Sequence, residues 1–298
     1  MARTISQRIV DALPVLDDVS ESVQPRVQEA IDKGGTRTRN ILDGVWFEVP
    51  LHPVVTDVPV GSWTAALVFD GLDALTGKKA MRSAADASVA LGVVGAIGAA
   101  VTGLSDWRYL SGGSRRMGMA HGLLNSIALL LNIVSLVLRA TGRRNGGRWT
   151  FLAGYSLSGM AAHLGGELSY KYGLRVNRNV FEPTGPEEFT RVLDESELAN
   201  GAVRRVEVDG SGILLSRARG EICAISATCN HFGGPLEQGT REGDTIVCPL
   251  HESRFDLCSG EVIDGPAVFP QSRYETRVRG GGIEVKAAVA ENVEENVT

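Results

Sequence analysis

Four long stretches that carry almost no charge dominate the first two thirds of the chain. They cover residues 58–69, 87–104, 117–138 and 149–166. A helix needs about 20 mostly apolar residues to cross the hydrocarbon core of a bilayer. The second and third stretches meet that need, the fourth nearly does, and Asp70 makes the first marginal. We therefore predict a bundle of four transmembrane helices.

A buried, soluble helical bundle is the alternative interpretation of these stretches. Helices of soluble bundles keep a polar face toward water, and these stretches lack one. Gly92, Gly95 and Gly98 also recur at intervals of three in the second stretch. Small residues let membrane helices approach closely, whereas each glycine costs a soluble helix about 1 kcal/mol relative to alanine. The pattern favours a membrane domain, and the same glycines would suit a homo-oligomer.

Residues 1–44 contain no apolar run long enough for a signal peptide. Their apolar positions keep a helical period from Ile5 to Leu16, which Pro14 interrupts. We expect a short amphipathic segment that lies on the membrane surface or packs on the bundle.

Four spans place both ends of the chain on one side of the membrane. Basic residues near the spans are slightly more numerous on that side: Lys33, Arg37, Arg39, Arg108, Arg115, Arg116, Lys171, Arg175 and Arg178, against Lys78, Lys79, Arg82, Arg139, Arg143, Arg144 and Arg148. Under the positive-inside rule this small excess predicts that the shared side is cytoplasmic. The chain would then lie in the lipid bilayer of a bacterial inner (plasma) membrane.

After residue 180 the pattern changes to short alternating runs such as AVRRVEVDG and GILLSRARG, separated by glycine turns. Such runs are typical of β-strands. We predict a transmembrane domain over residues 45–180, a small all-β domain over 181–288 and an acidic tail over 289–298. The predicted fold is therefore multi-domain, with an α-helical membrane bundle followed by a small all-β domain.

Composition excludes several functional classes. The 298 residues have a formal net charge of −5, which does not suit a nucleic-acid binder. Hydrophobic residues make up 43% of the chain, enough for a packed core and too many for general disorder. Four cysteines are too few for a disulfide-rich scaffold.

Two short Cys–His pairs in the β domain carry the strongest chemical signal. They are Cys229-Asn-His231 and Cys248-Pro-Leu-His251. Thiolates and imidazoles suit iron and zinc, but a zinc finger has one Cys–Cys and one His–His pair. Here each pair combines one cysteine with one histidine. That arrangement suits a [2Fe–2S] cluster in which two cysteines bind one iron and two histidines bind the other.

The sequence CNHFGGPLEQG…IVCPLHESRFDLCSGEVIDGPA resembles the Rieske iron–sulfur domain, and Rieske-type ferredoxins most. The resemblance implies that Cys229 and Cys248 bind one iron and that His231 and His251 bind the other. It also implies one-electron transfer without substrate chemistry.

Departures from the respiratory Rieske type concern the residues around the cluster. Gly234 and Leu250 stand where that type has two further cysteines. Ser253 is present and would tune the potential, whereas Phe255 replaces a tyrosine. Fewer hydrogen bonds to sulfur predict a potential in the lower or middle part of the Rieske range of about −150 to +300 mV.

We expect no metal or redox chemistry at the two remaining cysteines, Cys223 and Cys258. Cys223 is interpreted as a core thiol and Cys258 as a turn residue. A cytoplasmic β domain would keep both reduced, so a disulfide between them is disfavoured.

The helical half resembles an uncharacterised four-span bacterial membrane family of unknown function, through HPVVTDVPVGSWTAALVFDGLDALTG, SDW, AHGLLN and HLGGELSYKYG. Its three histidines, His52, His121 and His163, all fall toward the end from which the β domain emerges. Two of them could bind a b-type haem, or the site could take a quinone or a metal, or all three could be structural. We expect Asp70 to pair with a basic or amide group such as Asn132.

The favoured hypothesis is a membrane-anchored Rieske ferredoxin that exchanges single electrons with a reductase, an oxygenase or a quinone. Only 47 residues follow His251 and none is histidine, so we expect an electron-transfer component rather than a complete oxygenase. The alternatives are an integral haem- or quinone-linked oxidoreductase that uses the cluster as a relay, and a redox sensor.

Overall fold

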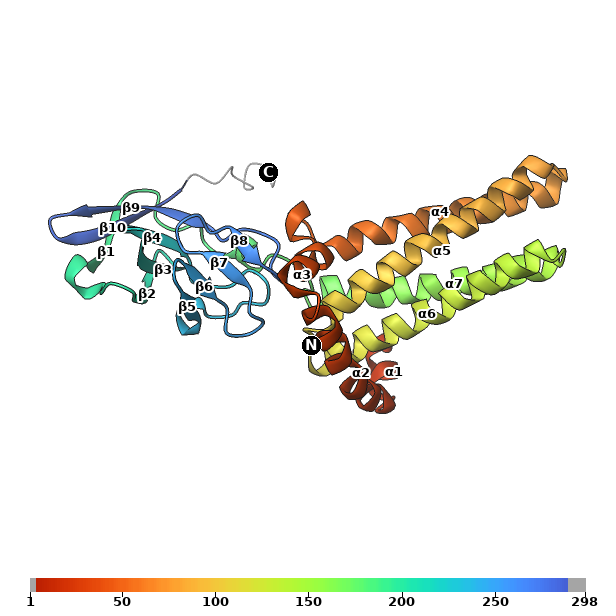
Figure 1. Ribbon diagram of the computed structural model, residues 1–298, viewed down its shortest axis with the longest axis horizontal. Coiled ribbons are helices and arrows are strands. Elements are labelled where there is room, and N and C mark those ends of the chain that lie inside the picture. Colours follow the sequence, from red (N-terminus) through yellow and green to blue (C-terminus); the bar gives the residue numbers. More distant parts are fainter. Residues whose placement is uncertain (1–3, 289–298) are drawn as a thin grey trace. The chain divides into compact units, whose positions relative to one another are not determined.

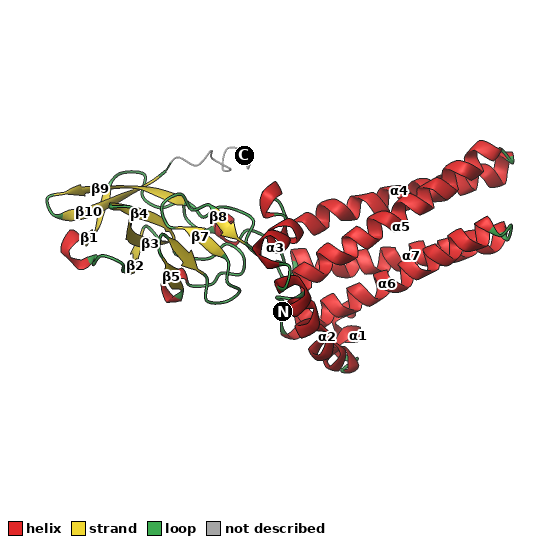
Figure 2. Cartoon of the chain, viewed as in Figure 1, coloured by secondary structure: helices red, strands yellow, loops and turns green. Residues whose placement is uncertain are grey.

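The computed structural model describes residues 4–288, so the predicted acidic tail at 289–298 lies outside the described residues. The chain divides into a helical unit and a β unit (Figures 1 and 2). The helical unit comprises the chain up to residue 44 together with 50–174, and the β unit comprises 45–49 together with the chain from 175 onward. The predicted order, a helical domain followed by a small all-β domain, is confirmed.

The helical unit is built on two antiparallel hairpins. They are formed by α4 (Leu51–Thr76) with α5 (Lys79–Trp107), and by α6 (Gly112–Ala140) with α7 (Arg144–Tyr170). Gly77, with a φ of +64°, ends α4 in the left-handed conformation that glycine tolerates. Since neighbouring helices alternate in direction, the starts of α4 and α6 lie at the same end as the ends of α5 and α7 (Figure 1).

Two of these four helices, α5 and α6, are long and apolar enough to cross a membrane. Only 28% and 22% of their most apolar windows are buried inside the structure. Their apolar side chains therefore face outward, as the exposure of Val94 and Leu130 shows. Helices in the core of a soluble bundle would bury these side chains.

Three shorter helices close one end of the hairpins: α1 (Ile5–Asp11), α2 (Val15–Asp32) and α3 (Gly35–Asp43). The buried Asp43 accepts hydrogen bonds from Ser105 Oγ at 2.8 Å and from Arg108 Nη2 at 3.0 Å. Gln24 donates to the carbonyl of Leu110 at 2.8 Å. The N-terminal segment is thus packed on the bundle through polar contacts.

At the other end, three aspartates and several arginines form one ion-pair network. Arg139 Nη1 donates to Asp70 Oδ1 at 2.9 Å and to Asp86 Oδ1 at 3.0 Å, and Arg144 Nε donates to Asp73 Oδ2 at 3.0 Å. The predicted basic partner of Asp70 is present, but the suggested amide partner is wrong. Asn132 donates instead to the carbonyl of Ala128 in its own helix, because a buried side-chain amide four residues on can reach that carbonyl.

The β unit contains a six-stranded and a four-stranded antiparallel sheet. The larger has the order β1-β10-β9-β4-β3-β2, and the smaller the order β5-β6-β7-β8. The strands are β1 (Thr190–Asp194), β2 (Val203–Val208), β3 (Ser211–Ala218), β4 (Glu221–Ser226), β5 (Thr240–Glu242), β6 (Thr245–Val247), β7 (Arg254–Asp256), β8 (Val262–Asp264), β9 (Arg273–Arg279) and β10 (Gly282–Ala287). Short 3₁₀ turns are η1 (Val45–Phe47), η2 (Arg178–Phe181), η3 (Glu195–Glu197) and η4 (Leu236–Gln238).

A single apolar core joins the two sheets. Leu214 and Ile225 of the larger sheet pack in one cluster with Ile246 and Phe255 of the smaller sheet, and all four are fully buried. Alternate residues of β3 and β4 fill a second core on the opposite face of the larger sheet. Of the two Cys–His pairs, the first lies between β4 of the larger sheet and β5 of the smaller sheet, and the second lies between β6 and β7 of the smaller sheet.

Candidate metal centre

The two Cys–His pairs lie in two loops that share one backbone frame. The first loop follows β4, and the second joins β6 to β7. In the first, Cys229 N donates to Gly234 O at 2.7 Å, and Gly233 N donates to Cys229 O at 2.8 Å. In the second, Cys248 N donates to Ser253 O at 2.8 Å, and Glu252 N donates to Cys248 O at 3.1 Å.

Each loop also reverses direction at the same point. Gly233 has a φ of +73°, and Glu252, its counterpart, has a φ of +62°. The cysteine backbone is thus locked into the loop at both its N–H and its C=O.

The two cysteine sulfurs face each other inside the β-unit core. Both cysteines are almost fully buried. Their mutual hydrogen bond lowers the pKa of Cys248 to about 6 and raises the pKa of Cys229. Backbone N–H groups of Leu250 and His251 donate to the Cys248 sulfur and further favour its thiolate. Thiolates are the form of cysteine that binds metals.

The two histidine rings lie next to each other, 5.2 Å apart between ring centres and nearly perpendicular. His231 is buried and His251 partly buried. Burial lowers the pKa of the His251 imidazole, which keeps that ring neutral at physiological pH. Two thiols and two imidazoles from facing loops make the donor set that fits a [2Fe–2S] cluster of the mixed Cys–His type.

Gly234 allows the second loop to lie against the first. A Cβ atom at this position would stand 2.7 Å from Cys248 Sγ and 3.2 Å from Leu250 Cγ. Phe255, which stands where the respiratory type has tyrosine, is fully buried in the same core as both cysteines.

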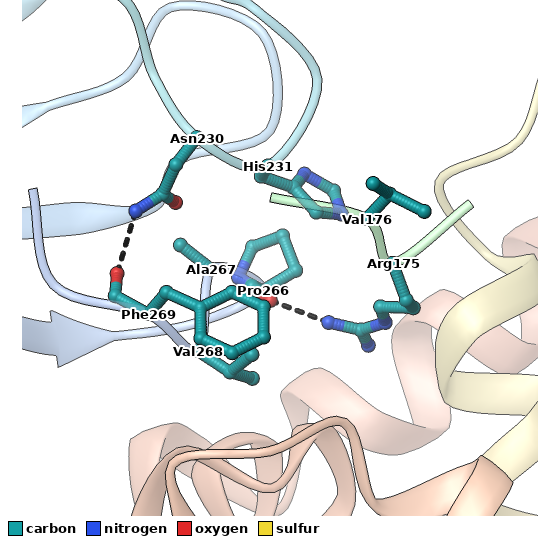
Figure 3. A pocket seen from close by; sticks show the side chains of 8 residues that line it. All are labelled: Arg175, Val176, Asn230, His231, Pro266, Ala267, Val268 and Phe269. Carbon is teal, nitrogen blue, oxygen red and sulfur yellow. Dashed lines mark hydrogen bonds between the residues drawn. The ribbon is translucent and has the colours of Figure 1, made fainter. Parts of the chain in front are cut away.

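A third loop, residues 266–270, is tied to both Cys–His loops. Asn230 Nδ2 donates to the carbonyls of Phe269 at 2.7 Å and Pro270 at 3.0 Å. Ser253 Oγ accepts from Ala267 N at 3.0 Å, and Arg175 donates to the Pro266 carbonyl. Figure 3 shows the small hollow between them, which is lined by Arg175, Val176, Asn230, His231, Pro266, Ala267, Val268 and Phe269.

Sequence reasoning overlooked the positioning role of Asn230. Its signal was present, because a buried amide between a cysteine and a histidine ligand candidate has to find hydrogen-bond partners. The two carbonyls that accept from Asn230 belong to Phe269 and Pro270, about 40 residues further along the chain, so the spacing of the motif does not reveal them.

The interpretation of Cys223 and Cys258 as reduced residues is wrong. The two are joined by a disulfide that links β4 to the turn after β7, with Cα atoms 4.7 Å apart. The physical reason is tertiary: the smaller sheet folds back over β4, which brings together residues 35 positions apart. Cys229 and Cys248 are the two cysteines that remain free.

The structure brings together two of the three histidines of the helical unit. The rings of His52 and His121 have centres 6.3 Å apart. His163 is instead largely exposed and lies 3.4 Å from Ser6 Oγ and 3.6 Å from Glu167 Oε1. Of the three candidate histidines, His52 and His121 are the two that lie close to each other.

Comparison with known families decides the identity of both parts. The model of a predicted membrane protein family, DUF2231, matches residues 48–178. The model of the Rieske [2Fe-2S] domain matches residues 188–275. The chain is a DUF2231 domain followed by a Rieske [2Fe–2S] domain.

Ferredoxins of bacterial dioxygenase systems are among the relatives of the Rieske domain. The ferredoxin component of the naphthalene 1,2-dioxygenase system from Pseudomonas aeruginosa is 34% identical over 84 residues, which are 28% of this chain and 81% of that protein. Ferredoxin CarAc from Metapseudomonas resinovorans is 31% identical over 96 residues, 32% of this chain and 90% of that one.

A solved structure resembles the same part of the chain. The ferredoxin of carbazole 1,9a-dioxygenase from Nocardioides aromaticivorans IC177 is 31% identical and matches with a TM-score of 0.32, over 34% of this chain and 98% of that one. A Rieske domain implies a [2Fe–2S] cluster and electron transfer.

Proposed function

We propose that this protein is a membrane-anchored Rieske ferredoxin that carries one electron between a donor and an acceptor. Cys229 and Cys248 bind one iron of the cluster, and His231 and His251 bind the other. The observation that carries the proposal is the matched pair of loops. The two cysteines hold the same place in the same backbone frame, and each is followed two or three residues later by a histidine, with the two rings 5.2 Å apart.

The protein's own groups do two things for such a cluster. Backbone N–H groups of His231, Phe232, Leu250 and His251 donate to the cysteine sulfurs and so stabilise negative charge there. The apolar core around Phe255 excludes water from the cysteine side. The cluster itself supplies a one-electron couple, and hydrogen bonds and burial set its potential.

The experiment is electron paramagnetic resonance of the dithionite-reduced full chain, purified in detergent after expression under iron-replete conditions. We expect the wild type to show the spectrum of a Cys2His2-ligated cluster, and Cys229→Ser and His251→Ala to lose it. His163→Ala changes an exposed histidine elsewhere and is the matched control. A cluster spectrum that survives either ligand variant would show that the ligand set is wrong.

Membrane anchoring is supported by the outward-facing apolar surface of α5 and α6. A surface built from residues such as Leu91, Val101 and Val137 would aggregate in water, whereas a bilayer covers it. We expect the chain to stay with membranes during alkaline carbonate extraction and to require detergent for release. Full release by carbonate would contradict anchoring.

The partners are inferred from the relatives, which are named as components of dioxygenase systems. By analogy, a reductase donates the electron to the cluster and an oxygenase accepts it. If the membrane domain takes part in electron transfer, a quinol is the donor instead. Stopped-flow reduction of the cluster by a ferredoxin reductase with NADH, compared with a short-chain quinol, distinguishes the two donors. If neither donor reduces the cluster within seconds, the time scale of ordinary enzyme turnover, the redox-sensor hypothesis is favoured.

A further inference from the structure

The two helical hairpins are structural repeats of each other. His52 and Trp63 in α4 have the same spacing as His121 and Asn132 in α6. Gly92 and Gly103 in α5 have the same spacing as Gly154 and Gly165 in α7.

The contacts repeat as well as the spacing. A Cβ atom at Gly103 would stand 2.9 Å from His52 Cε1, and one at Gly165 would stand 3.0 Å from His121 Cε1. Further along, Gly92 lies against Trp63 and Gly154 against Asn132 in the same way. Each hairpin thus uses a glycine to seat one histidine ring against its second helix.

Both rings make the same hydrogen bond through Nδ1. His52 Nδ1 is 2.9 Å from the carbonyl of Ala99, and His121 Nδ1 is 2.8 Å from the carbonyl of Ala161. Thr102 Oγ1 also lies near this nitrogen, 3.4 Å from His52 Nδ1. Since a carbonyl oxygen only accepts hydrogen bonds, each Nδ1 carries a proton, and in the neutral ring the lone pair is on Nε2.

The surroundings of His121 fix this form a second time. The Asn125 side-chain amide lies 3.1 Å from His121 Nε2, where an amide N–H donates to a lone pair. That lone pair is the one a metal would take, so the Asn125 amide has to turn away from Nε2 when a metal binds. An imidazole that donates from Nδ1 to a backbone carbonyl and offers Nε2 is the usual arrangement of a histidine that binds a metal.

The separation of the two rings suits one shared metal atom. Two imidazoles that bind opposite faces of a metal, at metal–nitrogen distances of about 2.0–2.1 Å, would hold their ring centres roughly 6 Å apart. The ring centres of His52 and His121 lie 6.3 Å apart.

The donor set points to a haem rather than a bare ion. Within residues 4–288, the one close group of three or more His, Cys, Asp or Glu ligand atoms is Glu221, Cys223 and Cys258 in the β unit, so the two histidines are not part of a larger cluster of this kind. Two nitrogen donors do not complete the tetrahedral coordination of zinc, but they complete that of an iron held by a porphyrin. We propose that His52 and His121 are the axial ligands of a non-covalently bound, b-type haem in the DUF2231 domain.

The test is the haem content of the full chain, purified from membranes of cells supplied with a haem precursor. The pyridine haemochrome and the reduced-minus-oxidised spectrum measure the haem, and the Rieske signal of the same sample reports independently that the chain is folded. We expect the wild type to bind haem and to show low-spin ferric resonances of bis-histidine ligation. His52→Ala and His121→Ala should each lose the haem, while His163→Ala should keep it.

Two further variants keep the proposal testable if the alanine variants fold poorly. His121→Met offers a different axial ligand, so it should retain haem while its potential rises and its low-spin resonances change. Gly103→Ala should weaken haem binding, whereas Gly61→Ala, which meets no neighbouring atom, should not. A haem-free wild type that still shows the Rieske signal would overturn the proposal, as would full haem content in both alanine variants.

Discussion

Ser253 Oγ accepts a hydrogen bond from the backbone N–H of Ala267 at 3.0 Å. Ser253 is fully buried in the second Cys–His loop, and because its oxygen already has a donor, its hydroxyl proton is directed elsewhere. The bond also joins the loop that carries Cys248 and His251 to the third loop, so this side chain helps to hold the ligand loop in position.

We expect Ser253→Ala to lower the reduction potential of the cluster. A hydrogen bond to a cluster sulfur stabilises the more negative, reduced form, and a loss of about 1 kcal/mol corresponds to roughly 40 mV for a one-electron couple. Dye-mediated redox titration followed by EPR measures the shift. Ser216→Ala removes an equally buried hydroxyl in β3 and should leave the potential unchanged. An unaltered potential in Ser253→Ala would show that this hydroxyl does not face the cluster.

The matched turns of the two loops predict opposite effects of matched substitutions. Gly233 and Glu252 occupy the same left-handed position, which costs a residue with a side chain about 1–2 kcal/mol. No atom lies near a Cβ at Gly233, so Gly233→Ala should destabilise by that conformational cost alone. Glu252→Gly should be neutral or stabilising. The midpoint of thermal loss of the cluster absorbance measures both, and equal shifts in the same direction would contradict the shared frame.

The sequence was sufficient for features that depend on local spacing. Cys229, His231, Cys248 and His251 stand close to each other in two short segments, and their residue types already restrict the chemistry. The order of a helical domain and a β domain follows from a change of hydrophobic period, which is also local.

Features that depend on tertiary packing could not be predicted from the sequence. Three histidines were placed at one end of the helices, but only the pairing of two hairpins brings His52 to His121 and leaves His163 exposed. In the same way, no pattern connects Asn230 with residues 269–270, because the contact arises when the third loop folds over the first. Hydropathy likewise could not choose between Asn132 and Arg139 as the partner of Asp70.

Asp256 provides a pH-dependent contribution to the stability of the β unit. Burial alone would raise the pKa of its carboxyl, but hydrogen bonds from Ser259 and Cys258 and from Arg219 outweigh burial and lower the pKa. Oδ1 accepts from the backbone N–H of Ser259 at 2.8 Å and of Cys258 at 2.9 Å. A folded-state pKa below the unfolded value of about 3.9 gives stability that is present above that value and is lost as the pH falls through the folded pKa.

We therefore expect Asp256→Asn to cost about 1–3 kcal/mol at neutral pH, and the difference from wild type to shrink as the pH falls below about 4. Urea unfolding followed by circular dichroism, which does not depend on the acid-labile cluster, tests both points across that range. Asp244→Asn alters the more exposed partner of Arg219, 3.4 Å away, and should cost less than about 1 kcal/mol. A cost for Asp256→Asn that stays constant with pH would contradict the linkage.

The Cys223–Cys258 disulfide bears on which side of the membrane the β domain faces. Disulfides persist in oxidising compartments and are rare in the cytoplasm of mesophiles. The small excess of basic residues predicted a cytoplasmic β domain, and that excess rests on charges at both ends that are largely engaged in ion pairs, such as Arg115 and Arg144. The disulfide is therefore the more specific of the two indications.

We expect only two of the four cysteines to be alkylated when cells are quenched in acid and the denatured protein is treated with a thiol reagent. Acid releases the cluster and frees Cys229 and Cys248, while a disulfide formed in the cell keeps Cys223 and Cys258 unreactive until a reductant is added. Mass spectrometry counts the additions and locates them. The Cys223→Ser/Cys258→Ser double variant should give two additions with or without reductant, which calibrates the count. Four additions to the wild type without reductant would place these thiols in a reducing compartment, and the β domain would then face the cytoplasm as the charge pattern predicted.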